Sequence, residues 1–355
     1  MAPPLPKALF LTQECPFPPT SGAKMRDSRM IQFLVERMEV ELLCFARDKQ
    51  ERDAFFGALA TPPRELKLTL LPSSRSIFHR TLPNMEQALR ARAAKGKLLW
   101  VSREEMSPYI PLARELGYRV ILDSDRECKG CKESDLIVTT SDADATRMLR
   151  QVPRAPVQVI PNSIDFKAYE SARSGQGKTL FFSGSLSLPA NVEGLAWFIE
   201  EVLPRLRAAR GPSLPRIVAA GSEPTQDLRK NLEKVGVEVL SNPPSILPAL
   251  SEAAIAFVPM RSGEGTRLKI LEAMAAGRAV VTTSKGAEGL LLSPGYDIWI
   301  SDSADGFTSG ILRLLESPAL RSELGARACE TVRTRYDWIH VGGLFDRLLR
   351  EFART

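Results

Sequence analysis

Short, continuous runs of apolar, β-branched and aromatic residues alternate with helical patterns along this chain, and that alternation constrains its fold most strongly. The runs are not broken by a polar residue at every second position. Strands read this way when helices cover both faces of a parallel sheet. The expected strands are 8–12, 40–45, 67–72, 97–102, 119–124, 135–140, 157–162, 179–185, 216–222, 237–241, 255–259, 279–284 and 298–301. The sequence therefore predicts a doubly wound α/β fold.

Helical patterns lie between these runs. The clearest is NVEGLAWFIEEVLPRL, in which Val192, Leu195, Ala196, Ile199 and Leu203 fall on one face of a single helix. Two further helices are expected over Arg26–Met38 and Ser107–Leu116, and the segment DWIHVGGLFDRLLREF is an amphipathic helix with no strand after it.

A chain of 355 residues is too long for one ordinary core and suits two domains. The polar, Gly- and Ser-rich stretch Glu170–Lys178 separates two strand–helix series. We expect a first Rossmann-like domain over 1–168, closed by a C-terminal helix at about 339–355, and a second over 176–338. Ligands of such sheets bind outside the carboxyl ends of the strands, so the cleft between the two domains is the expected site.

Composition and charge limit the partners. Hydrophobic residues make up 44% and charged residues 25% of the chain, which is typical of soluble proteins. No apolar run approaches the roughly 18 residues of a membrane span, and the first residues do not resemble a signal peptide, so we expect a cytoplasmic protein.

The net charge is +6, and its densest patch, Arg80–Lys97, has a basic amphipathic pattern. A solvated helix face is the favoured interpretation. The alternative is that this segment makes peripheral contact with the anionic inner surface of a membrane. Nucleic acid is not expected, because no aromatic residues accompany the basic ones.

The five cysteines are an odd number and thinly spread, which fits a reducing compartment. Cys128 and Cys131 form a CxxC. Two functional interpretations of this motif are half of a zinc site and a redox pair. The favoured interpretation is that the two residues are loop thiols without a function. A zinc site needs about four ligands, the only histidines are His79 and His340, and there is no second CxxC, so no metal is expected.

The stretch RSGEGTRLKILEAMAAG (261–277) directly follows an expected buried strand. Gly265 belongs to a flexible turn, Thr266 is a suitable N-cap, and Gly277 is a suitable C-terminal stop for the helix between them. The free N–H groups of that helix would bind an anion such as phosphate at the carboxyl end of the strand. Arg267 and Lys269 add cations in the first turn. Cations at this end of a helix oppose the helix dipole, so their presence is better explained if an anion binds between them.

Glu272 lies four residues after Leu268 on this helix, so it stands beside the packed face. A half-buried carboxylate requires hydrogen-bond donors, and sugar hydroxyls supply them. The constellation as a whole favours a binding function over a solvated surface helix.

The segment GEGTRLKILEAMAAGRAVVTTSKGAEGL resembles the donor-binding segment of family 4 glycosyltransferases, which are retaining enzymes with the GT-B fold. Glu264 and Glu272 match the Glu-x7-Glu spacing of that family. Further similar segments are FFSGSLSLPANVEGLAWFIEEVLP (181–204), VIPNSIDFKAY (159–169), SDADATRML (141–149), PPSILPALSEAAIAFVP (243–259), LRSELGARACETVRTRYDW (320–338) and FPPTSGAKMRDSRMIQFL (17–34). The resemblance is dense over 179–340 and patchier before it.

The resemblance implies a donor site for a nucleotide diphospho-sugar and no further cofactor. Glu264 would hold hydroxyls of the transferred sugar, and Glu272 would hold the ribose. Thr266, Arg267 and Lys269 would approach the diphosphate. The other donor-binding residues implied are Gly22, Gly184, Ser185, Asn191, Ile246, Gly265 and Leu268.

Three departures from the family matter. The loop SLSLPAN carries no basic residue, so Arg267 and Lys269 are the expected charged partners of the diphosphate. The position at which relatives place a histidine offers Ser102, Arg103 and Glu104 instead. The connection DSDRECKGCK is short, which removes part of the expected acceptor wall. Asp123 and Asp125 have the Asp-x-Asp form but lie far in sequence from the donor motifs.

The predicted function is metal-independent, retaining transfer of a sugar to a glycan, lipid-linked or small-molecule acceptor, as in polysaccharide biosynthesis. Two alternatives stay open. One is a GT-B epimerase or phosphorylase, and the other is a nucleotide-sugar-binding protein without catalysis.

Overall fold

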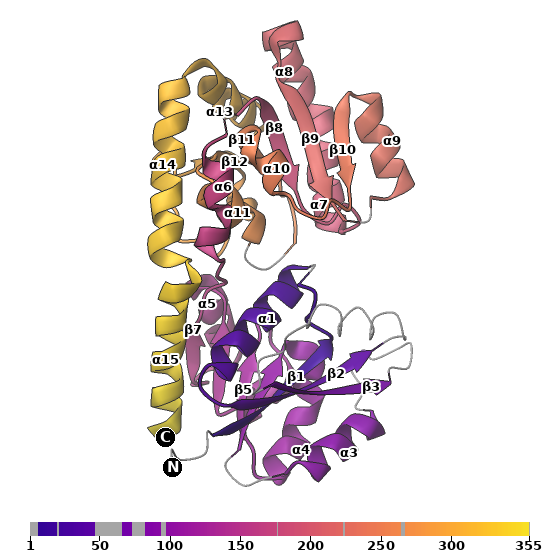
Figure 1. Ribbon diagram of the computed structural model, residues 1–355, viewed down its shortest axis with the longest axis vertical. Helices are drawn as coiled ribbons and strands as arrows, with labels where there is room; N and C mark the ends of the chain where they lie inside the picture. The colour runs from indigo at the N-terminus through magenta and orange to yellow at the C-terminus, as the bar shows by residue number, and fades with distance from the viewer. Residues whose placement is uncertain are drawn as a thin grey trace. The chain divides into compact units, whose positions relative to one another are not determined.

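The structure is a computed structural model that describes residues 6–19, 21–46, 66–72, 82–93, 97–175, 177–222, 224–263 and 267–354. The described chain forms two compact units, and Figure 1 traces their elements. The first unit comprises Met1–Pro161 and Gly342–Thr355, and the second comprises Asn162–Val341.

The first unit is built on a seven-stranded parallel sheet of order β3-β2-β1-β4-β5-β6-β7. The elements in chain order are β1 (Lys7–Glu14), α1 (Gly22–Val35), β2 (Glu39–Ala46), β3 (Leu66–Pro72), α3 (Pro83–Ala91), β4 (Leu98–Ser102), η1 (Glu104–Tyr109), α4 (Ile110–Glu115), β5 (Arg119–Asp123), η2 (Lys129–Glu133), β6 (Leu136–Thr139), α5 (Asp142–Gln151), β7 (Val157–Val159) and, from the end of the chain, α15 (Trp338–Arg354), whose residues up to Val341 belong to the second unit. The strand order reverses between β1 and β4, as in a doubly wound fold.

The second unit is built on a six-stranded parallel sheet of order β10-β9-β8-β11-β12-β13. Its elements are η3 (Phe166–Tyr169), α6 (Glu170–Arg173), β8 (Thr179–Ser183), α7 (Pro189–Trp197), η4 (Phe198–Val202), α8 (Leu203–Arg210), η5 (Gly211–Ser213), β9 (Arg216–Gly221), α9 (Gln226–Lys234), β10 (Val237–Ser241), α10 (Leu247–Ser251), β11 (Ala253–Val258), α11 (Leu268–Ala275), β12 (Ala279–Thr282), α12 (Ser284–Ala287), β13 (Trp299–Ile300), α13 (Ala304–Glu316) and α14 (Pro318–Arg335). The order reverses between β8 and β11. Both predicted sheets, and the doubly wound fold class, are confirmed.

Several helices begin at a serine or threonine whose side chain satisfies a backbone N–H of the first turn. The hydroxyl groups of Ser21, Ser141, Thr225, Ser303 and Ser317 accept from the amides of residues Lys24, Asp144, Leu228, Gly306 and Leu320 respectively. Such caps stabilise a helix by about 1 kcal/mol each and fix where it starts.

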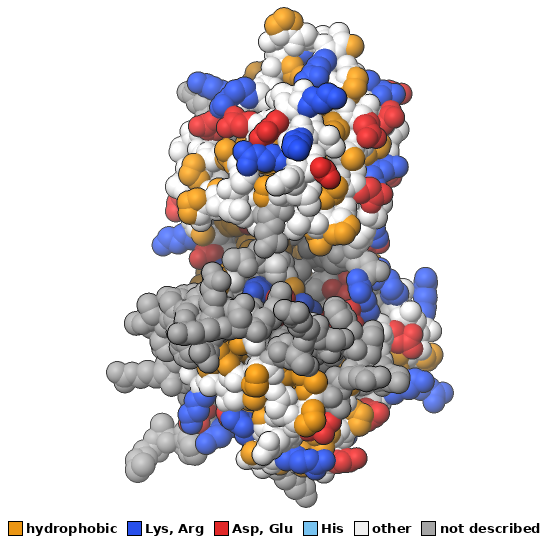
Figure 2. Space-filling view, turned by 90° about the vertical axis from the view of Figure 1, so that its right-hand side faces the viewer, with side chains coloured by type: hydrophobic (Ala, Val, Ile, Leu, Met, Phe, Trp, Pro, Cys, Tyr) orange, Lys and Arg blue, Asp and Glu red, His pale blue; other side chains and the backbone are white. Residues whose placement is uncertain are grey.

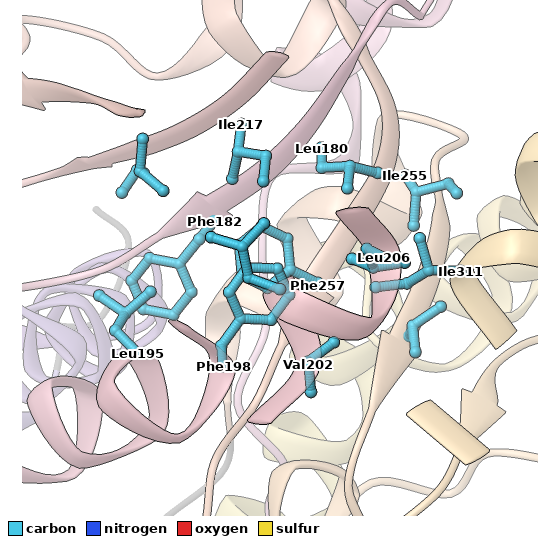
Figure 3. Close-up of a cluster of buried hydrophobic side chains, with 14 of the residues drawn as sticks. Leu180, Phe182, Leu195, Phe198, Val202, Leu206, Ile217, Ile255, Phe257 and Ile311 are labelled. Carbon is cyan, nitrogen blue, oxygen red and sulfur yellow. The ribbon is translucent and has the colours of Figure 1, made fainter. Parts of the chain in front are cut away.

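The core of the second unit lies between the sheet and α7, α8 and α13. Its aromatic centre is drawn in Figure 3, where Phe198 stacks on Phe257 at a centroid distance of 4.2 Å. Phe182 lies 6.0 Å from Phe257 on the neighbouring strand. Phe182 immediately precedes the last residue of β8, so the core reaches up to the carboxyl end of the sheet.

The single helix expected over NVEGLAWFIEEVLPRL is interrupted. α7 ends at Trp197, a π-helical turn spans η4, and α8 resumes at Leu203. Pro204 lies in the first turn of α8, and a proline has no N–H for the residue four positions earlier, so the widened turn occurs where that bond is missing.

The division between the units lies earlier than the expected linker at Glu170–Lys178. The amide of Lys178 donates to Glu252 O at 2.6 Å, and Arg173 Nε donates to Ala275 O at 2.9 Å, so this stretch is bound into the second unit. A Cβ on Gly177 would lie 2.3 Å from Ala253 O. This glycine permits close approach of two backbones, and its presence does not mark a flexible linker.

The basic segment Arg80–Lys97 contains α3, which spans Pro83–Ala91. Met85 and Leu89 are fully buried in the core of the first unit, so the apolar face of the helix is covered. Among the described residues of this segment, the exposed side chains are polar or small, namely Pro83, Gln87, Arg90, Ala91 and Ala93. On the face drawn in Figure 2, basic and acidic side chains are interspersed. In the part of the chain that is described, no helix is long and apolar enough to cross a membrane.

Candidate functional site

The candidate site lies where β8 and β11 diverge at the strand-order reversal of the second sheet. β8 ends at Ser183, and Gly184 follows with φ +146°, a backbone conformation that side chains other than glycine rarely adopt. The amide of Gly184 donates to Ala220 O at 3.0 Å, which fixes the turn against β9. The next residue, Ser185, opens the loop that leads to α7, and its hydroxyl lies 3.1 Å from that of Ser187.

Gly184 lies under two polar side chains that come from different helices. A Cβ at this position would be 2.6 Å from Lys269 Nζ and 3.0 Å from Asn191 Nδ2. Any other residue here would displace the lysine or the asparagine. The glycine predicted from sequence therefore has a second role, because its missing side chain leaves room for the cation.

Lys269 and Asn191 form a linked pair over this turn. Lys269 Nζ donates to Asn191 Oδ1 at 2.6 Å, and Asn191 Nδ2 donates to Ser185 O at 2.6 Å. The ammonium group also lies 4.5 Å from the centroid of the Phe182 ring, a cation–π contact. Residues predicted from two separate segments, Ser185 and Asn191 from 181–204 and Lys269 from the segment after β11, are thus brought together.

The environment of Lys269 disfavours its charged form. Burial and, to a smaller extent, the nearby Arg267 guanidinium lower the pKa of Lys269, Glu272 acts in the opposite direction, and the resulting pKa is about 7. Among the described residues, no carboxylate lies within ion-pair distance of its ammonium group. An anion arriving at this position would raise the pKa again and bind the protonated form.

Glu272 lies one turn further along α11 and is half-buried. Tyr169 Oη, from η3, donates to Glu272 Oε1 at 2.9 Å. Burial raises the pKa of Glu272, while the Tyr169 hydrogen bond and Lys269 hold it down. The sequence predicted that this carboxylate needs hydrogen-bond donors, and Tyr169 supplies one. Tyr169 was not predicted as a site residue, although it is the last residue of the segment VIPNSIDFKAY.

Arg267 occupies the N-cap position of α11, with φ −83° and ψ 88°, and Nη2 donates to Ser262 O at 3.2 Å. The helix therefore begins one residue later than the predicted cap at Thr266 would place it, because Arg267 is not helical. Glu264, Gly265 and Thr266 lie outside the described residues. At the other end, Gly277 has φ +69° and its amide donates to Met274 O at 2.9 Å, so the predicted helix stop is confirmed.

The remaining residues predicted to bind the donor lie in different elements of the structure. Leu268 is 8% exposed and its side chain packs into the second unit. Ile246 occupies the N-cap position of α10, beyond the carboxyl end of β10. Gly22 is the first residue of α1 and belongs to the first unit.

A second polar cluster, not predicted from the sequence, lies at the strand-order reversal of the first unit. Arg26 Nε and Nη2 donate to Asp123 Oδ1 at 2.9 and 2.7 Å, and Arg26 Nη1 donates to Ile160 O at 3.0 Å. Next to it, Thr12 Oγ1 donates to Asp27 Oδ2 at 2.7 Å. Burial raises the pKa of Asp123 to about 6, against the pull of Arg26.

Both carboxylates of the Asp-x-Asp pair, Asp123 and Asp125, accept hydrogen bonds from other groups of the protein. Asp123 is bound by Arg26, and Asp125 accepts from the amide and the hydroxyl of Thr140 at 2.8 and 3.0 Å. Across the described ranges, no group of three or more His, Cys, Asp or Glu side chains is arranged to hold a metal ion.

Comparison with known proteins places this site in a recognised domain. Residues 177–317 match the family described as Glycosyl transferases group 1. The match lies within the second unit and contains the β8 turn, Asn191, Lys269 and Glu272. The chain is 30% identical over 202 residues to a phosphatidyl-myo-inositol mannosyltransferase of Mycolicibacterium smegmatis, with 53% of this chain and 50% of that protein covered. The chain thus spans about half the length of the curated relatives it matches.

The fold as a whole is that of GT-B glycosyltransferases. Sucrose-phosphate synthase from Thermosynechococcus elongatus superimposes with a TM-score of 0.76 at 15% identity, over 99% of this chain and 100% of that chain. Anabaena HepE in complex with UDP-glucose superimposes with a TM-score of 0.72 at 15% identity, over 97% and 99%. At these identities the likeness establishes the fold alone, and the predicted GT-B architecture is confirmed.

Proposed function

We propose that the protein is a retaining glycosyltransferase that takes its sugar from a nucleotide diphospho-sugar bound to the second unit. The observation that carries the proposal is the position of Lys269. Its ammonium group lies above a glycine turn at the carboxyl end of β8, is held by an asparagine, and has no described carboxylate partner. A cation so placed is suited to a diphosphate.

The leaving nucleoside diphosphate develops negative charge as the bond to the sugar breaks. Lys269, Arg267 and the backbone N–H of Ser185 would stabilise that charge, because the amide of Gly184 already donates to Ala220 O. An electrostatic contribution of this kind needs no metal ion. The loop SLSLPAN carries no basic residue, so the charge would be balanced mainly by the two side chains of the α11 segment.

Glu264 and Glu272 are proposed as hydroxyl-binding groups on the sugar and on the ribose. For Glu272, support comes from its hydrogen bond to Tyr169, because the same carboxylate oxygen that accepts from a phenol can accept from a ribose hydroxyl. The acceptor hydroxyl would attack the anomeric carbon from the face of the leaving group, and a phosphate oxygen would take its proton. The protein would then act chiefly by positioning the two substrates.

The comparisons support the donor class and one acceptor class. One structural neighbour was solved in complex with UDP-glucose, which supports a nucleotide diphospho-sugar as donor. The matched relative is named for transfer of mannose to phosphatidyl-myo-inositol, which supports a lipid-linked acceptor among the classes expected from the sequence. Peripheral membrane contact through the polar face of α3 is part of this proposal.

The test is product analysis with a Glu264→Gln variant. The protein is incubated with UDP- and GDP-linked hexoses and with phosphatidyl-inositol vesicles or free sugars, and released nucleoside diphosphate and the anomeric configuration of the product are measured. The wild type is expected to release nucleoside diphosphate with retention of configuration. Glu264→Gln is expected to lower the rate about 100-fold, since it removes a charged group that contacts the sugar in the transition state.

The matched control is Glu233→Gln, an exposed glutamate of α9 that pairs with Arg229 at 2.7 Å, and it should leave the rate unchanged. Unchanged rate and donor affinity in Glu264→Gln would overturn the assignment. An isomerised donor would indicate an epimerase, and donor binding without transfer to any acceptor would indicate a binding protein.

A further inference from the structure

The CxxC motif plays no part in the proposed donor site, and the structure places its two sulfur atoms together. Cys128 occupies the N-cap position of η2, the short helix after β5, and Cys131 lies in its first turn. The two Sγ atoms are 3.1 Å apart, and none of the five cysteines is in a disulfide. A disulfide bond measures about 2.05 Å, so an approach of about 1 Å would join the two sulfurs.

The backbone of η2 holds this pair in place. The amide of Cys128 donates to Cys131 Sγ at 3.1 Å, and the amide of Cys131 donates to Cys128 O at 3.1 Å. Ser134 Oγ donates to Gly130 O at 2.8 Å and closes the following turn. The two thiols therefore face one another as part of an ordered turn, whereas the favoured interpretation of the sequence was two loop thiols without a function.

The two thiols differ in exposure and in acidity. Cys128 is partly exposed, whereas Cys131 is 1% exposed and packs in the core of the first unit. The hydrogen bond from Cys131, together with the Ser107 hydroxyl of η1 and the amides of Gly130 and Cys131, lowers the pKa of Cys128. The same pairing, burial and the nearby Glu127 raise the pKa of Cys131. In a redox dithiol, an accessible thiol of lowered pKa attacks first, and a second, less acidic thiol beside it then completes the disulfide. The exposure and pKa of Cys128 and Cys131 match these two roles.

We propose that Cys128 and Cys131 form a redox-active dithiol that closes to an intramolecular disulfide by exchange with a small-molecule disulfide. The Cys128 thiolate attacks one sulfur of that disulfide, forms a mixed disulfide and releases one small thiolate. Cys131 then loses its proton to solvent and attacks Cys128 Sγ, which releases the second small thiolate. Two protein thiols are oxidised, and one disulfide is reduced to two thiols.

The zinc interpretation of the motif receives no support from the described residues. Among the residues that the structure describes, no third His, Cys, Asp or Glu is arranged with the pair to hold a metal ion there. A zinc site is built from about four such ligands.

The test uses the full-length protein in buffers of reduced and oxidised glutathione at pH 7, with free thiols trapped by a maleimide and located by peptide mass mapping. The wild type is expected to yield a linked Cys128–Cys131 peptide, while Cys15, Cys44 and Cys329 stay as thiols. Cys128 is expected to react at least ~10-fold faster than Cys329, whose pKa is raised by burial. The rate at which Cys128 reacts with the maleimide should rise with pH and reach half its maximum at a pH below about 8.5, which is the midpoint for an ordinary thiol.

Two variants separate the roles. Cys131→Ser should accumulate a lasting glutathione adduct on Cys128, because the second attack is missing. Cys128→Ser should leave Cys131 at least ~10-fold less reactive than Cys128 in the wild type. Absence of the linked peptide in the wild type, or equal reactivity of Cys128 and Cys329, would overturn the proposal whether or not either variant folds.

Discussion

Replacing Lys269 by methionine is expected to weaken binding of a nucleotide diphospho-sugar about 100-fold. The substitution keeps the apolar stem that contacts Phe182 and removes the charge above the β8 turn. Removing one partner of a buried, hydrogen-bonded charge pair costs about 2–5 kcal/mol of binding free energy. Isothermal titration of the wild type and the variant with the same donor measures the loss directly.

The pH dependence of that affinity has a definite sign. The pKa of Lys269 is lowered to about 7 without ligand, and a bound diphosphate favours the protonated form. Affinity should therefore be constant below about pH 7 and fall above it, by at most tenfold per pH unit. The diphosphate of a nucleotide sugar keeps the same charge over the neutral range, so Lys269→Met should show no such fall.

The same substitution should stabilise the ligand-free protein, by up to about 4 kcal/mol at pH 7, because it removes the cost of burying an amine. The folded pKa of Lys269 is about 7 and its ordinary value is 10.5, so between these values the unfolded chain holds a proton that the folded chain lacks. The wild type should thus gain stability as pH rises from about 7 towards 10, and the difference from the variant should shrink.

Lys230→Met is the matched control, because Lys230 is an exposed lysine on α9 of the same unit. It should leave donor affinity and its pH profile unchanged and alter stability by no more than about 0.5 kcal/mol. A Lys269→Met protein that binds donor as tightly as the wild type would show that the ammonium group does not contact the diphosphate.

Replacing Arg26 by methionine is expected to lower the free energy of unfolding by about 3–5 kcal/mol at pH 8. Arg26 is bound to Asp123 through two nitrogen atoms and also donates to Ile160 O. Its loss leaves the buried Asp123, which is 4% exposed, without a cation in contact among the described residues, and the buried Asp27 lies next to the same site. Chemical denaturation followed by circular dichroism measures the change.

This loss should depend on pH. The pKa of Asp123 is already raised to about 6 from 3.8, so its charged form destabilises the fold increasingly as pH rises through this range. Without Arg26 the folded pKa rises further, and the deficit of the variant should shrink when the pH is lowered from 8 to 5.

Arg90→Met, on the exposed side of α3 in the same unit, is the control and should change stability by no more than about 0.5 kcal/mol at either pH. A deficit in Arg26→Met that does not change between pH 5 and pH 8 would contradict the assignment of this cost to an uncompensated carboxylate.

The strands were predictable from the sequence because both faces of each sheet are covered. A strand such as β11, buried along its whole length, has no polar face, so its apolar run stands out against the amphipathic helices beside it. The glycine turn after β8 and the helix stop at Gly277 were also predictable, since both have the positive φ that favours glycine. The fold class and the position of most strands follow from these local signals.

The partners of individual side chains were not predictable in the same way. Tyr169 and Glu272 are far apart in the chain, and nothing near Glu272 in the sequence indicates that a phenol reaches it. Arg26 and Asp123 are likewise joined only by the folded sheet. The stretch Glu170–Lys178 has the composition of a linker, but its glycines allow backbone contacts that only the tertiary structure defines.

The central claim is that the second unit binds a nucleotide diphospho-sugar through Lys269 and the turn at Gly184. Its most direct test is thermal unfolding of the wild type and Lys269→Met in the presence of UDP, GDP, ADP and their hexose conjugates. At 100-fold excess over Kd, a bound nucleotide adds about 2.7 kcal/mol of stability, so at least one member should raise the Tm of the wild type by several degrees. Lys269→Met should lose most of that shift. Silence of the wild type across the whole panel, or a shift of equal size in the variant, would contradict the account.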